Sequence, residues 1–199
     1  MSTPDVSGLW RQADSAQAEA QATYPEMACC SGCNDCCKHH GSPITYASEW
    51  EQIQPWLEDR PEVLAGIRQR YAALKQDLRQ RLQAPGVPSL AEALFELPCP
   101  CIEPGPAGER CAIYPVRPLT CRSFGNALLE AAPSSGDAIY TCNPEKSRWE
   151  RELPMLQEIR LPLREQLFAA LAAEKPRSLL SFLERFLLSQ ADASPGPQP

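Results

Sequence analysis

The cysteines of this chain constrain its fold more than any other feature. Ten of its 199 residues are cysteine, and all but one lie in two short stretches, residues 29–37 and 99–121. The first stretch reads Cys-Cys-Ser-Gly-Cys-Asn-Asp-Cys-Cys and places Cys30, Cys33 and Cys36 at steps of three residues. That spacing opens bacterial ferredoxin motifs, in which the chain wraps a small inorganic centre and a cysteine from elsewhere completes it. We therefore expect the fold to bring the two groups of thiols together.

The composition and the first residues favour metal ligands over disulfides. A chain of 199 residues that is 43% hydrophobic is long enough to bury one core of ordinary size. Residues 1–10 show neither the basic start nor the apolar segment of a secretory signal, and no apolar run is long enough to span a bilayer. We expect a cytosolic protein, and clustered cysteines in a reducing cytosol are more often metal ligands or redox groups than disulfides.

The net charge argues against two classes of partner. The formal charge is −6, whereas binding to nucleic acid or to an anionic membrane requires a concentrated basic surface. We therefore expect no nucleic acid and no membrane as partners. A protein partner, or a partner that exchanges electrons with a metal centre, is compatible with an acidic chain.

Apolar periodicity predicts a mostly α fold, a helical bundle with cysteine-rich metal-binding loops and little or no β-sheet. One helix is expected from Asp5 to Tyr24, where Pro25 ends it. A second helix is expected to be capped by Ser48 and to be limited or kinked by Pro55.

The clearest predicted helix opens at residues 59–62 and carries one apolar stripe from Val63 to Leu82, before the proline-rich residues 85–88 stop it. The basic residues that flank this stripe are interpreted as a solvated face rather than an anion site. They are Arg68, Arg70, Lys75, Arg79 and Arg81. Two further helices are expected to have Pro162 and Pro176 in their first turns and to pack as an antiparallel pair.

We expect one domain with four parts. An N-terminal helix occupies residues 1–28, and a cysteine-cluster core with inserted helices occupies residues 29–142. Residues 143–188 are expected to form C-terminal helices that pack on this core. Residues 189–199 are polar and rich in proline, and we expect them to form a disordered tail. Within the core, residues 99–122 are too rich in proline and glycine for a long element, and metal ligation would supply the missing folding energy.

Thiolate is the donor that both cysteine groups share, and sulfur ligands favour zinc or iron–sulfur clusters over magnesium or calcium. The candidate metal ligands are Cys30, Cys33, Cys36, Cys37, Cys99, Cys101, Cys111, Cys121 and Cys142. Adjacent residues seldom direct both side chains at one small centre, so Cys36 and Cys37 are open to serving two different centres. Cys29 is equally well explained as a small buried apolar residue. His39 and His40 are alternative zinc ligands, and otherwise they are exposed loop histidines.

Three ordered motifs carry a resemblance to a known family. They are CSGCNDCC at residues 30–37, CPCI at residues 99–102 and CAIYPVRPLTCRSF at residues 111–124. The chain resembles the YkgJ-type cysteine-cluster proteins, also called the CxxCxxCC or zinc- or iron-chelating family. The resemblance implies a small, mostly helical bacterial protein that holds an iron–sulfur cluster, for example 4Fe–4S, with zinc as the rival assignment. The family pattern has one cysteine where this chain has Cys99 and Cys101, so which of the two binds metal stays open.

Arg117 and Arg122 bracket Cys121 within the third motif, and they are the candidate cofactor-binding residues. A centre ligated by several thiolates carries negative charge, which a nearby guanidinium would offset while donating hydrogen bonds. The alternative is that each arginine stabilises an ordinary turn. Tyr114 is interpreted as a core aromatic residue rather than as part of the site.

The leading hypothesis is a cytosolic protein whose iron–sulfur cluster is held by the first cysteine group together with Cys99 or Cys101, Cys111 and Cys121. Its function would be redox or cluster-dependent chemistry. A second hypothesis is a zinc-stabilised protein-binding module, in which the metal is structural. A third, by resemblance to a flagellin lysine N-methylase alone, is a methyltransferase that uses S-adenosylmethionine. We assign no catalytic residue, and an iron–sulfur oxidoreductase is the enzyme class we would expect.

Overall fold

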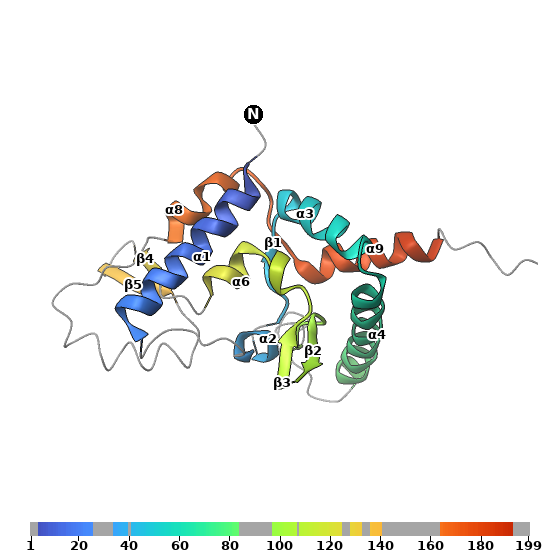
Figure 1. Cartoon of the computed structure of the whole chain (residues 1–199). Helices are drawn as coiled ribbons and strands as arrows, with labels where there is room; N and C mark the ends of the chain where they lie inside the picture. The colour runs from blue at the N-terminus through green and yellow to red at the C-terminus, as the bar shows by residue number, and fades with distance from the viewer. Residues whose placement is uncertain are drawn as a thin grey trace, which may run out of the picture.

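The fold is mostly α-helical, as the apolar periodicity predicts (Figure 1). The structure is a computed structural model that describes residues 4–25, 34–39, 41–83, 97–106, 108–124, 128–132, 136–140 and 164–192. Its α-helices are α1 (Val6–Thr23), α2 (Asp35–His39), α3 (Ala47–Glu58), α4 (Pro61–Gln83), α6 (Leu119–Ser123), α8 (Arg164–Phe168) and α9 (Leu179–Asp192). Two short 3-10 helices are η2 (Tyr114–Val116) and η4 (Ala169–Leu171). Within these ranges the strands form three two-stranded antiparallel sheets, β1 (Ile44–Thr45) with β6 (Arg177–Ser178), β2 (Ile102–Gly105) with β3 (Gly108–Cys111), and β4 (Leu128–Ala132) with β5 (Gly136–Tyr140).

Helix α1 begins and ends close to where the sequence predicts. The Asp5 side chain accepts a hydrogen bond from the backbone N–H of Gly8 (2.9 Å), which satisfies one free donor of the first turn. The helix stops at Thr23, because Tyr24 precedes Pro25 and the residue before a proline disfavours helical backbone. Its buried residues are Val6, Trp10 and Ala13.

Helix α3 begins earlier than predicted. Its N-cap is Tyr46 rather than Ser48, which lies buried inside the first turn. The cause is Glu49, whose carboxylate accepts the backbone N–H of Tyr46 (3.1 Å) and starts the helix before Ser48. Pro55 does not end α3, which continues to Glu58. The buried apolar residues of α3 are Trp50, Ile53 and Leu57.

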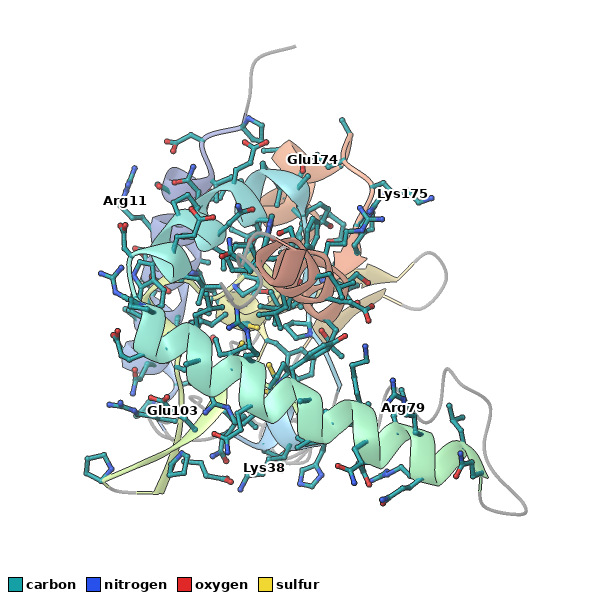
Figure 2. All side chains as sticks on the ribbon, turned by 90° about the vertical axis from the view of Figure 1, so that its right-hand side faces the viewer. Arg11, Lys38, Arg79, Glu103, Glu174 and Lys175 are labelled. Carbon is teal, nitrogen blue, oxygen red and sulfur yellow. The ribbon has the colours of Figure 1, made fainter. Side chains whose placement is uncertain are left out.

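Helix α4 follows the predicted apolar stripe, but its core contacts are confined to the N-terminal half. Leu64 and Ile67 are buried, whereas Leu82 near the other end is 42% exposed. Arg79 lies on the half of α4 that projects past the other elements (Figure 2). Two other predicted helix boundaries, residues 85–88 and Pro162, lie outside the described residues.

The C-terminal helices do not pair with each other, contrary to the prediction. Helix α8 lies beside α1, and α9 lies beside α3 and α4 (Figure 1). The two helices diverge because α9 covers α3, where Phe182 and Phe186 contact Trp50 at ring-centroid distances of 5.4 and 5.9 Å. The prediction that Pro176 lies in the first helical turn is also wrong, because the two residues after it form β6 and pair with β1. Helix α9 continues to Asp192, into the segment predicted to be a tail.

Candidate metal centre

The β2–β3 hairpin holds two cysteines at its open end. In its register Ile102 pairs with Cys111, and the backbone N–H of Ala112 donates to the carbonyl of Cys101 (2.7 Å). The hairpin turns at Gly108, whose φ of +118° is accessible to glycine and strained for other residues. Cys101 and Cys111 therefore lie on neighbouring strands at the end where the hairpin joins the rest of the fold.

Helix α2, which carries the adjacent cysteines of the first group, is attached to this hairpin. The backbone N–H of Cys99 donates to the carbonyl of Cys37 (2.7 Å). Glu109 of β3 accepts a hydrogen bond from the Asn34 amide (3.2 Å) and pairs with the Lys38 ammonium (2.5 Å). These contacts join the two cysteine groups, although α3 and α4 separate them along the chain.

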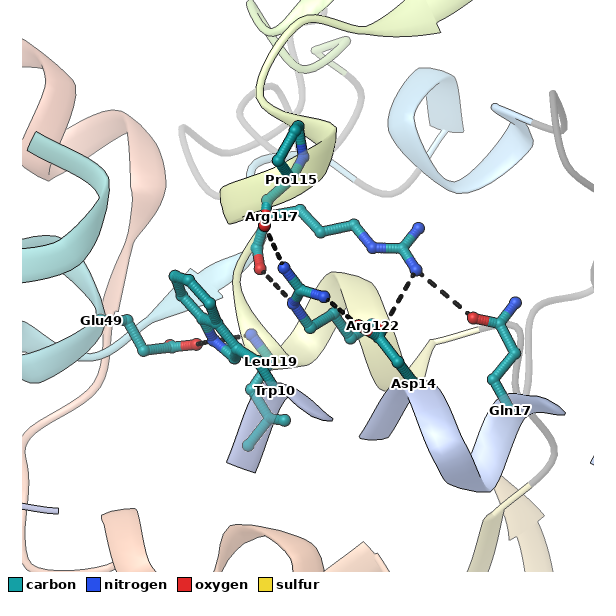
Figure 3. Close-up of polar contacts among 8 residues, drawn as sticks. All are labelled: Trp10, Asp14, Gln17, Glu49, Pro115, Arg117, Leu119 and Arg122. Carbon is teal, nitrogen blue, oxygen red and sulfur yellow. Dashed lines mark hydrogen bonds and ion pairs between the residues drawn. The ribbon is translucent and has the colours of Figure 1, made fainter. Parts of the chain in front are cut away.

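Helix α6, which carries Cys121, is anchored by a buried carboxylate that our sequence analysis missed (Figure 3). Oε1 of Glu49 accepts the backbone N–H of Leu119 (2.5 Å) and the indole N–H of Trp10 (3.0 Å). Glu49 is fully buried, and this burial raises the pKa of its carboxyl, which the accepted hydrogen bonds oppose only in part. The one local signal is its place three residues after Tyr46, a spacing typical of a capping box.

The described thiols are free, and they act on one another through their charges. They are the buried Cys99 and Cys101 and the half-buried Cys36, Cys37, Cys111 and Cys121. Burial, with added charge from Cys99, Cys111 and Cys36, raises the pKa of Cys121 well above its usual value. Burial, followed by charge from Cys99 and to a smaller extent Cys36, raises the pKa of Cys111 to about 12. The contact that places the two groups beside each other is the hydrogen bond from the N–H of Cys99 to the carbonyl of Cys37, the residue after Cys36.

Two pairs of thiols stand out within this set. The sulfurs of Cys36 and Cys37 are 3.9 Å apart, and their hydrogen bond, together with burial, raises the pKa of Cys36. Cys37 also packs against the hydrophobic core. In the second pair, the hydrogen bond from the Cys101 thiol lowers the pKa of Cys99 and raises that of Cys101.

The structure does not by itself assemble a set of metal ligands. Among the residues it describes, no three His, Cys, Asp or Glu side chains are grouped so as to hold one metal ion. The ligand assignment therefore stays a prediction, and part of it lies outside the described residues. The candidates there are Cys29, Cys30, Cys33, His40 and Cys142. His39, at the end of α2, is 66% exposed and lies 3.8 Å from Asp35.

Arg122 makes the contacts of a turn-stabilising arginine (Figure 3). Only 6% of the residue is exposed. Its Nη2 donates to the carbonyl of Pro115 (2.6 Å) and its Nε to the carbonyl of Arg117 (2.9 Å). Its Nη1 pairs with Asp14 of α1 (2.5 Å). These bonds fix the turn between η2 and α6 and tie it to α1.

Arg117 acts on the thiols through its charge. Its guanidinium lies 4.0 Å from the ring centroid of Tyr114. It also lies 3.7 Å from Asp14 (Figure 3). Against the dominant effect of burial, this charge lowers the pKa of Cys111 and Cys121. Tyr114 is 50% exposed, so the interpretation of this residue as part of the core is wrong.

Buried and half-buried thiols are donors whose chemistry suits zinc or an iron–sulfur cluster. No described helix combines the length and the apolar character needed to cross a membrane. In comparisons with known proteins, residues 29–145, which are more than half of the chain, match the CxxCxxCC family model, described as a putative zinc- or iron-chelating domain. No curated protein and no solved structure matches the chain. The family match and the joined cysteine groups agree: the chain is a metal-binding protein that belongs to the CxxCxxCC family.

Proposed function

We propose that this protein holds an iron–sulfur cluster on thiolates from both cysteine groups and serves in redox or cluster-dependent chemistry. The observation that carries the proposal is the hydrogen bond from the backbone N–H of Cys99 to the carbonyl of Cys37 (2.7 Å), which joins the second cysteine group to the first. A structural zinc site and a 4Fe–4S cluster each use four cysteines, so the number of thiols does not choose between them. The steps of three residues between Cys30, Cys33 and Cys36, a spacing that opens ferredoxin motifs, favour the cluster.

The surroundings of these thiols are compatible with a redox centre. The reduction potential of an iron–sulfur cluster depends on net charge, on hydrogen bonds to the sulfurs and on solvent exposure. Cys99 and Cys101 are buried, and Arg117 adds positive charge. When bound, a cluster would supply one-electron transfer, and the partner would be a protein that exchanges electrons with it. Free cysteines fit the reducing cytosol that we propose as the compartment.

A structural zinc site in a protein-binding module is the second candidate, and one observation favours it. Cys99, Cys101, Cys111 and Cys121 alone supply four thiols, the number that a tetrahedral zinc site requires. They lie in a segment of short strands and turns that regular hydrogen bonding holds only in part. Methyl transfer, in contrast, gains no support from the described residues and is not proposed.

The test is metal and sulfide analysis of the full chain purified without oxygen, together with its absorption spectrum and electron paramagnetic resonance after reduction. We expect iron and inorganic sulfide in similar amounts and visible charge-transfer absorption. Stoichiometric zinc with neither iron nor sulfide would refute the cluster and support the zinc module. Cys36→Ser separates the candidates further, because it removes a ligand of the proposed cluster and leaves the four later thiols intact.

A further inference from the structure

Arg70 of α4 contacts the turn that contains the buried cysteines. Its position beside the apolar stripe of this helix had predicted a solvated residue. Its side chain is 27% exposed. Its Nε donates to the carbonyl of Pro100 (2.7 Å), the residue between the two cysteines. Gly66, one helical turn earlier, leaves room for this arrangement, because a Cβ at that position would lie 3.1 Å from Nη1 of Arg70. The guanidinium is therefore folded back along α4 and held on the cysteine turn.

Among the described residues, one edge of this guanidinium has no hydrogen-bond acceptor, and its one charged neighbour there is a carboxylate at ion-pair distance. Nη2 of Arg70 is buried and makes no hydrogen bond among the described residues. It lies 4.0 Å from Oε2 of Glu103, which is too long for a hydrogen bond. Glu103, beside the N-terminal half of α4 (Figure 2), is instead engaged by Arg110, whose Nε and Nη2 each lie 2.8 Å from Oε1. A buried donor without a partner is costly, so this edge suits an additional negative acceptor.

Arg70 brings a positive charge to the cysteine turn, because its hydrogen bond to the carbonyl of Pro100 holds the guanidinium at the residue between Cys99 and Cys101. Thiolates that ligate a metal carry negative charge, which a guanidinium at this place would offset. Unlike Arg117 and Arg122, Arg70 lies outside the three cysteine motifs.

We propose that Arg70 is a positioning residue of the metal centre, whose guanidinium orients the turn of residues 99–101 and offsets the negative charge of the bound metal–thiolate group. The proposal rests on the proposed function, in that the thiols must bind a metal. It holds for zinc and for an iron–sulfur cluster alike, because both carry negative charge when several thiolates ligate them. Arg70 would act on the metal only through the turn and through its charge.

The experiment is a titration of the reduced, metal-free full chain with cobalt(II) without oxygen, followed by thiolate-to-cobalt absorption. The variants are Arg70→Gln, Arg70→Lys and, as a matched control, Arg68→Gln, which changes an exposed arginine of the same helix. We expect Arg70→Gln to weaken cobalt binding about 10- to 100-fold, as the loss of a residue that orients metal ligands does at other metal sites. Arg70→Lys should recover part of the affinity, since lysine keeps the charge but not the planar fork.

The absorption band distinguishes this role from a purely structural one. Removing a charge beside the thiolates shifts the energy of the thiolate-to-cobalt band, whereas a general loss of stability only lowers the melting temperature of the metal-free protein. The proposal would be overturned if Arg70→Gln bound cobalt with the same affinity as Arg68→Gln and showed the same absorption band. This holds whatever the melting temperature of Arg70→Gln. A wild-type protein without thiolate-to-cobalt absorption would instead refute the binding of a metal ion by these thiols, and the inference with it, whereas the proposed cluster is judged separately by its iron and sulfide content.

Discussion

The buried carboxylate of Glu49 gives the most demanding test of how the cysteine-bearing elements are held. Its two oxygens accept three N–H groups, from Trp10 in α1, Leu119 in α6 and Tyr46 at the start of α3. The donors on Trp10 and Leu119 are buried, so truncation leaves both without an acceptor. At roughly 1–3 kcal/mol for each unsatisfied buried group, Glu49→Ala should lower the free energy of unfolding by about 2–6 kcal/mol. That is a large part of the roughly 5–15 kcal/mol that stabilises a typical domain.

Glu49→Gln isolates the electrostatic part of the same contact. A glutamine keeps one carbonyl oxygen for Trp10 and Leu119 but turns an amide toward the N–H of Tyr46. We expect a loss of roughly 1–3 kcal/mol, because one acceptor is lost and the others are no longer charged. The assay is urea unfolding followed by circular dichroism, with Glu51→Gln as a control, since Glu51 is exposed on the same helix. Equal unfolding free energies for the two glutamine variants would refute the account of α6 anchoring.

Three further predictions follow from named contacts. Because burial raises the folded-state pKa of Glu49 above its ordinary value of 4.5, the stability linked to its protonation is fully present below that value and is lost as pH rises through the folded pKa. In urea titrations at increasing pH, the unfolding free energy of wild type should therefore approach that of Glu49→Gln. A difference between the two proteins that grows as pH rises would contradict the raised pKa. Asp14→Asn removes the carboxylate that pairs with the buried Arg122, and thermal unfolding should show a loss of about 1–2 kcal/mol, limited by the exposure of Asp14. Glu109→Gln should speed hydrogen exchange in α2 while leaving the melting temperature unchanged, since its contacts with Lys38 and Asn34 are exposed; unchanged exchange would show that they do not hold α2.

The sequence predicted the limits of α1, which depend on neighbouring residues, but not the start of α3, where the equally local cap of Tyr46 and Glu49 replaces the predicted cap at Ser48. The ends of α1 follow from Asp5 and Pro25, which act within one helical turn. Pro176 was misread for the opposite reason, since the residues after it pair with β1 from the other end of the chain. A proline that favours the first turn of a helix is a local signal, and it carries no information about pairing with a strand so far away in the sequence.

The sequence singles out candidate donors of the site but not the residues that support them. Cysteine spacing marks the thiols, because the ligand chemistry lies in the residues themselves, and which of these thiols bind metal stays a prediction. Glu49 and Arg70 were missed because their roles depend on partners brought near only by the fold, Leu119 for one and Pro100 for the other. An acidic residue in a first turn and a basic residue beside an apolar stripe are usually exposed, and pattern alone cannot mark the exceptions.

The claim that thiols of both groups share one inorganic centre is tested most directly by pulsed alkylation of the native protein, read by mass spectrometry with and without a metal chelator. Cys36 and Cys111 are the informative sites, because each comes from a different group and each is half-buried, so reagent can reach it. Since the pKa of both thiols is raised in the metal-free chain, the pulse is applied at alkaline pH, where more of each thiol is ionised. We predict that both are protected in the protein as purified and that the chelator raises their alkylation together, with the same dependence on chelator concentration. A chelator that releases one of the two and leaves the other unchanged would contradict a shared centre.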